Sequence, residues 1–64
     1  MPIDRKVADD RLEGFFLGLG ADRERYARAQ WRHLKQQGPM PNPTDFGISA
    51  RDGEQIRVIL AQHL

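Results

Sequence analysis

Five cationic side chains lie in residues 22–37, in the run DRERYARAQWRHLKQQ, and their chemistry is that of anion binding. At about 3.6 residues per helical turn, four of them share roughly a quarter-turn of one helix face. These four are Arg25, Arg28, Arg32 and Lys35. A row of such cations along a helix is the pattern with which proteins contact nucleic-acid phosphates. With Arg23 as the fifth cation, the segment predicts a nucleic-acid interface.

The turn before this helix makes the hypothesis more specific. Two glycines in residues 18–20 separate two expected helices, and a short glycine-containing turn between helices is the local pattern of a helix-turn-helix. In that arrangement Arg23 and Arg25 would contact base edges, while Arg28 and Arg32 would contact phosphates. Any helical hairpin has the same local pattern. The leading prediction is a small DNA-binding or transcription-regulating module that contacts phosphates through this helix.

The same cations have a plainer interpretation, which is an ordinary solvated helix face. The formal net charge is −1 over residues 1–21, +3 over residues 22–37 and −1 over residues 38–64. The positive charge is therefore local, and local charge steers binding. Three carboxylates of the preceding segment are available to neutralise it: Asp9, Asp10 and Glu13. In this interpretation the cations face solvent and are partly paired with these carboxylates. A related alternative is that they contact an acidic protein rather than a nucleic acid.

Two apolar residues lie off the apolar faces of their expected helices. Leu17 is placed roughly opposite Leu12, and Val58 roughly opposite Ile56. A chain of 64 residues buries only about 60% of its unfolded surface, and without cysteine it has no disulfide to stabilise it. The alternative prediction is a small adaptor, inhibitor or regulator that docks on a larger protein, or forms a homodimer, through Leu17 and Val58.

Catalysis finds little support in the sequence. Neither His33 nor His63 is spaced with a nucleophile and an orienting carboxylate. The glycines at 18 and 20 are half of a dinucleotide-binding fingerprint, but they follow a helix rather than a strand. Asp45 with His33 is too small a set for a metal site. We therefore expect no enzyme activity, no metal ion and no cofactor.

The sequence also indicates a cellular location for the protein. No apolar run approaches the roughly 20 residues that span a bilayer. The first residues, MPIDRKVADD, lack the apolar core of a signal peptide. We expect a cytoplasmic protein without membrane contact.

Three helices must position these residues, near residues 4–17, 22–37 and 50–63. Their expected N-caps are Asp4, Asp22 and Ser49, because a short polar side chain accepts from the free N–H groups of a helix start. Three prolines between residues 38 and 48 forbid a continuous helix and predict a crossover loop with a short helical turn at 43–46. Gly53 is expected to weaken the last helix.

The predicted fold is all-α, a single three-helix domain over residues 1–64. The first two helices form an antiparallel hairpin, and the proline-rich crossover lets the third pack across them. Phe46 is expected to anchor the loop, and Tyr26 to lie half-exposed. The expected core consists of Phe15, Phe16, Trp31, Leu34, Ile56, Ile59 and Leu60.

Overall fold

The computed structural model describes residues 5–64 and confirms an all-α fold. Three α-helices, α1 (Arg5–Leu17), α2 (Ala21–Leu34) and α3 (Ala50–Ala61), are joined by short turns and one long loop. A 3₁₀ helix, η1 (Pro43–Phe46), lies inside that loop where the sequence predicts a helical turn. No strand is present within residues 5–64.

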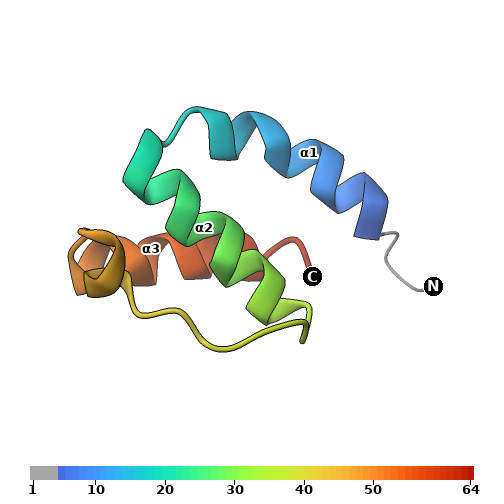
Figure 1. Cartoon of the computed structure of the whole chain (residues 1–64). Helices are drawn as coiled ribbons and strands as arrows, with labels where there is room; N and C mark the ends of the chain where they lie inside the picture. The colour runs from blue at the N-terminus through green and yellow to red at the C-terminus, as the bar shows by residue number, and fades with distance from the viewer. Residues whose placement is uncertain (1–4) are drawn as a thin grey trace.

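The helix α2 is the centre of the fold. Figure 1 shows α1 and α2 running in opposite directions and diverging from their shared turn, while α3 crosses behind α2. Both α1 and α3 contact α2, whereas no Cα atom of α1 lies within 8 Å of a Cα atom of α3. The predicted hairpin and crossover are therefore present, and α2 is the helix on which both outer helices pack.

The apolar core lies on both sides of α2. Among residues 7–64, the buried apolar side chains are Ala8, Leu12, Phe16, Tyr26, Ala27, Trp31, Ile48, Ile56 and Leu60. Phe15 and Leu34 are only partly buried against this cluster, and Tyr26 is buried rather than half-exposed. The prediction of Ile59 as a core residue is wrong, because 39% of it is exposed. Its side of α3 points towards α1, which does not reach it.

The ends of α2 differ from the sequence prediction. The N-cap is Gly20, with a φ of 87°, and no side chain caps the helix there. Asp22 is not the cap because its carboxylate instead accepts from Arg25, one turn along the helix. At the other end, Gln36 takes a left-handed φ of 65°, and Gln37 N–H donates to the carbonyl of Arg32 at 3.0 Å. This pattern ends the helix at Leu34, three residues before the predicted end.

The start of α3 follows its prediction, and its end does not. Ser49 is the N-cap, and its hydroxyl accepts from the N–H of Asp52 at 3.1 Å. The helix ends at Ala61 rather than at residue 63. The predicted cap Asp4 lies outside the described residues.

The proline-rich loop is fixed to α2 and α3 through η1. Phe46 is its anchor, as predicted, with its ring edge-on to Tyr26 at a centroid distance of 5.7 Å. The hydroxyl of Tyr26 donates to the carbonyl of Gly53 at 3.4 Å. A Cβ placed at Gly53 would lie only 2.6 Å from Cβ of Pro43. The glycine that the sequence marks as a weak point of α3 therefore permits the close contact between α3 and η1.

Candidate functional site

The predicted anion-binding side chains of α2 are mostly paired with carboxylates. Arg28 is bound most extensively: its two terminal nitrogens donate to Glu13 of α1 at 2.9 and 3.2 Å, and its Nε donates to Glu24 at 2.9 Å. These carboxylates raise the pKa of Arg28, and Arg28 lowers the pKa of Glu13. The guanidinium carbon also lies 4.8 Å from the centroid of the Phe16 ring. Arg28 therefore joins α1 to α2.

Lys35 makes a second link between the same two helices. Its ammonium lies 3.2 Å from Asp9 of α1 and 5.4 Å from the centroid of the Trp31 ring, and only 14% of its side chain is exposed. The indole N–H of Trp31 donates to the same carboxylate. This hydrogen bond, together with Lys35, holds the pKa of Asp9 below its usual value of 3.8. Lys35 is thus part of the α1–α2 interface.

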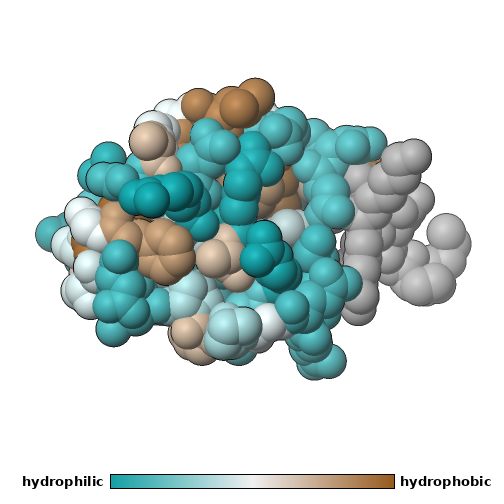
Figure 2. Space-filling model, viewed as in Figure 1, coloured by the Kyte–Doolittle hydropathy of each residue, from teal (hydrophilic) through white to brown (hydrophobic). Residues whose placement is uncertain are grey.

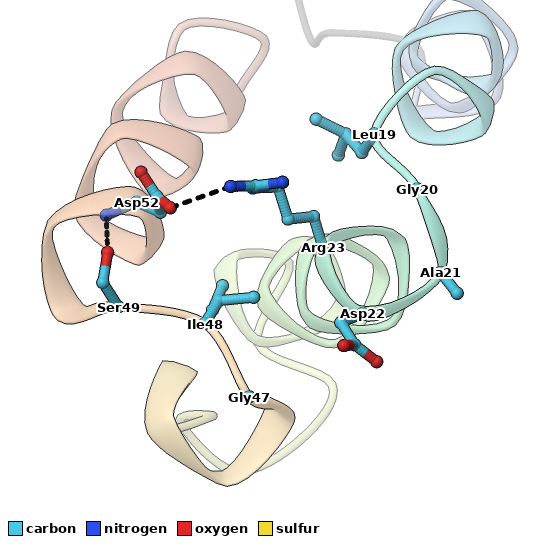
Figure 3. Close-up of a pocket in the computed structure, with 9 residues that line it drawn as sticks. All are labelled: Leu19, Gly20, Ala21, Asp22, Arg23, Gly47, Ile48, Ser49 and Asp52. Carbon is cyan, nitrogen blue, oxygen red and sulfur yellow. Dashed lines mark hydrogen bonds and ion pairs between the residues drawn. The ribbon is translucent and has the colours of Figure 1, made fainter.

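The remaining three cations are more exposed. Arg23 reaches across to α3 and pairs with Asp52 at 3.1 Å, as Figure 3 shows. Arg25 pairs with Asp22 of its own helix at 2.7 Å, and more than half of each side chain is exposed. Arg32 is exposed, and within residues 7–64 no carboxylate pairs with it.

These contacts answer the charge question that the sequence leaves open. Glu13 and Asp9 pair with α2, whereas Asp10 makes no ion pair within the described side chains. Four of the five cations, which are the four arginines of α2 and Lys35 directly after it, pair with carboxylates. Five carboxylates form these pairs, so the formal charges of the ten groups sum to zero. Figure 2, which has α2 towards the viewer, shows a mainly hydrophilic face on which hydrophobic residues appear only in separate areas.

The Asp9 contacts predict an acid-sensitive α1–α2 interface. Because the folded-state pKa of Asp9 is lowered, its ionised form stabilises the fold above about pH 4, and this contribution is lost as the pH falls through the lowered pKa. Asp9→Asn should destabilise the chain at pH 7 by about 1 kcal/mol, a modest figure because 46% of the side chain is exposed. The unfolding free energies of Asp9→Asn and wild type can be measured with urea from pH 7 to pH 2. The difference between them should shrink below pH 4.

Asp10→Asn is the matched control for this measurement. Asp10 is exposed and makes no ion pair within residues 7–64, so its replacement should leave the unfolding free energy close to wild type throughout. If the difference in unfolding free energy between Asp9→Asn and wild type stays constant down to pH 2, the ionised carboxylate is not what stabilises the interface.

The two predicted partner-surface residues are exposed. Leu17 is 64% exposed at the end of α1, and Val58 is 44% exposed on α3. Leu17 and Val58 lie on two different helices, α1 and α3, and no Cα atom of one helix lies within 8 Å of a Cα atom of the other. The structure therefore does not bring them together into one apolar surface, and isolated exposed apolar side chains are ordinary.

A different apolar surface lies between α1 and α3. Phe15 and Leu19 line one wall of a groove of about 180 Å³, and Ile56 and Ile59 line the other. Arg23 of α2 lies between the walls, paired with Asp52. This groove was not predicted from the sequence, because the apolar spacing of Phe15, Ile56 and Ile59 indicates a closed core. The only signal in the sequence is the width of the apolar stripes on α1 and α3. Packing against α2 alone buries only part of each stripe.

A second hollow, of about 320 Å³, adjoins the groove where α2 and α3 begin (Figure 3). The two share Leu19, Arg23 and Asp52. In the close-up, Leu19 projects from the end of α1 towards the space beside Arg23, and Asp22 points away from it. The one guanidinium that lines the hollow, that of Arg23, is already paired with Asp52, so the hollow does not favour an anion.

The part of the chain that the structure describes contains no candidate metal site. Within the described residues, no three His, Cys, Asp or Glu side chains come together in a way that would hold a metal ion. Over the same residues, no helix has the length and apolar character needed to cross a membrane.

Comparison with known proteins adds no family assignment: no protein family, no curated protein and no solved structure matches the chain. Function is therefore argued from the surfaces of this chain alone. The groove between α1 and α3 and the charged face of α2 are the two candidates.

Proposed function

We propose that this chain is a small protein-interaction module that docks on a partner through the groove between α1 and α3. The observation that carries the proposal is an apolar groove that the fold leaves open, with Phe15 and Ile59 on opposite walls. In a chain this short, apolar surface is scarce, and leaving it uncovered lowers stability. Apolar grooves of this kind between helices are the surfaces that amphipathic protein segments use.

The size of the groove favours a macromolecular partner over a small ligand. Sites for drug-sized molecules occupy about 300–1,000 Å³ and enclose most of the ligand. The groove offers about 180 Å³, which suits one or two apolar side chains of a larger surface. Such anchoring side chains supply most of the affinity in many protein interfaces.

Nucleic-acid binding through α2 is the second candidate function, and two outward cations favour it. Arg32 has no carboxylate partner among residues 7–64, and Arg25 has only an exposed one, worth little in stability. The other cations would have to give up Glu13, Asp9 or Asp52 before binding a phosphate. The net neutrality of this face makes the groove the better-supported site.

The proposed function predicts that the two faces of α3 behave differently in a cross-linking experiment. A photoreactive amino acid at position 59, in the groove, should cross-link the chain to a protein of defined mass in extracts of the cells that make it. The same group at position 58, on the outer side of α3, should give no such product. Equal products at both positions, or none at position 59, would contradict the proposal.

A titration with duplex DNA at several salt concentrations serves as the parallel control. Contact by all five cations would give a log–log salt slope near −5, whereas contact by Arg25 and Arg32 alone would give a slope of about −2. The groove proposal predicts no measurable binding at about 0.15 M salt. Tight binding with a slope near −5, abolished by Arg28→Glu with Arg32→Glu, would instead establish the nucleic-acid function.

A further inference from the structure

We propose that the cleft between α2 and the proline-rich loop binds a free aliphatic amino acid, with Arg32 contacting its carboxylate and Asp45 contacting its ammonium group. The cleft measures about 230 Å³, with Ala29 and Arg32 on its helix side and Asp45 and Phe46 on η1. It shares no lining residue with the groove between α1 and α3. The inference therefore goes beyond the proposed function and does not depend on it.

The loop that covers the cleft is held at both ends and is stiff between them. Figure 1 shows it leaving the end of α2 and running back along that helix to η1. The ring of His33 holds its first part, with Nδ1 lying 3.1 Å from the carbonyl oxygen of Gly38, and Asn42 caps η1 at its other end. Pro39 and Pro41 lie between these anchors, and each has a fixed φ. A stiff loop keeps the cleft open without a ligand, which lowers the entropy lost on binding.

Two opposite charges that line the cleft are left without partners. Arg32 and Asp45 are both exposed, and neither forms an ion pair within residues 7–64, with the other or with a third group. The stem of Arg32 lies along the loop, since a Cβ placed at Gly38 would be 3.8 Å from its Cδ. A simple anion would also meet Asp45, and a simple cation would also meet Arg32. A ligand with one charge of each sign satisfies both residues.

The rest of the lining selects an apolar ligand. Phe46, Ala29 and the two prolines line the cleft together with Met40, which is 59% exposed. An apolar group placed against Met40 and Phe46 would remove their exposed surface from water, which is favourable. The ligand that fits the cleft therefore has an apolar part as well as two opposite charges.

The size of the cleft limits the ligand to a small molecule. Its volume of about 230 Å³ is below the roughly 300 Å³ at which sites for drug-sized molecules begin. At about 30 Å³ for each water-sized group, it holds about eight such groups, close to the nine or so non-hydrogen atoms of leucine or methionine. A residue inside a peptide lacks both charges because its amino and carboxyl groups form amide bonds. A free amino acid with an aliphatic side chain meets all three requirements.

Leucine and three related compounds test the inference. Each is titrated into the isotope-labelled chain and followed by the amide chemical shifts of Arg32, Met40, Asp45 and Phe46. Leucine should shift these amides with a Kd of about 1 mM, the scale for so small a ligand. Leucinamide lacks the carboxylate and isocaproate lacks the ammonium group, so each should bind about fivefold more weakly, as expected for one lost exposed ion pair. Glycine, without an apolar side chain, should bind at least about tenfold more weakly.

Two variants assign each charge to its partner. Arg32→Gln should weaken leucine binding about fivefold and make leucine and leucinamide bind equally, because the ligand's carboxylate has lost its partner. Asp45→Asn should likewise make leucine and isocaproate bind equally. Arg25→Gln and Asp10→Asn are the matched controls, since both residues are exposed and outside the cleft, and they should leave every Kd within about twofold of wild type. Far-UV circular dichroism checks that each variant is folded.

Three results would overturn the inference. The first is the absence of shifts at the cleft residues with about 50 mM leucine, well above the expected Kd. The second is equal affinity of the wild-type chain for leucine, leucinamide and isocaproate. The third is a loss of leucine binding in Arg25→Gln as large as that in Arg32→Gln, which would place the ligand elsewhere on α2. None of these results bears on the cross-linking at position 59, so the proposed function stands or fails separately.

Discussion

Leu60→Ala is expected to lower the free energy of unfolding by about 2–5 kcal/mol, the range for removing a buried leucine side chain. Leu60 is fully buried, and α3 packs on α2 and η1. A chain of 64 residues has a total stability of about 3–10 kcal/mol, so the variant should lose a large part of it and should unfold at a clearly lower temperature than wild type. Thermal unfolding followed by circular dichroism at 222 nm measures the effect.

Ile59→Ala is the matched control, since it removes a side chain of the same size from the next position. Ile59 is 39% exposed, so the change should cost less than about 1 kcal/mol. The periodicity of the sequence places Ile59 and Leu60 on the same inner face. It therefore predicts that the two alanine variants lose similar amounts of unfolding free energy. Equal destabilisation by the two substitutions would mean that the groove is closed in solution and that Ile59 is a core residue.

Gly53→Ala is expected to destabilise the chain by about 1–2 kcal/mol, although alanine is the better helix former. An added Cβ would lie 2.6 Å from Cβ and 2.7 Å from Cγ of Pro43, and 3.3 Å from the Tyr26 ring. Pushing η1 away from α3 costs about 1–3 kcal/mol, which exceeds the gain of up to about 1 kcal/mol in helix propensity. Urea unfolding at pH 7 gives the difference between variant and wild type.

Gly14→Ala should change the unfolding free energy in the opposite direction in the same experiment. Gly14 lies inside α1, is exposed, and an added Cβ would meet no atom within 4 Å. Only helix propensity changes, so the variant should be more stable than wild type by about 0.5–1 kcal/mol. If both alanine variants are stabilised, α3 and η1 do not make the close contact described for Pro43.

The charged face of α2 shows why function was harder to derive than fold. A row of cations such as Arg28, Arg32 and Lys35 has the same sequence pattern whether it binds phosphates or seals a helix interface. The partners of Arg28 and Lys35 on α1 are Glu13 and Asp9, which lie 15 and 26 residues away in the chain. Helical spacing gives the direction of each side chain but not the distance to another helix. The nucleic-acid hypothesis therefore depended on geometry that the sequence does not contain.

The sequence by itself determined the local structure: three helices, the turn at Gly20, the Ser49 cap and the helical turn at Pro43–Phe46. These features depend on residues within one turn of each other, so their physics is local. Only the tertiary structure decided that Ile59 lines a groove, that Gly53 permits a close contact with Pro43, and that four cations of α2 are paired. Each of these depends on how far apart the packed helices lie, a distance set jointly by all the side chains between them.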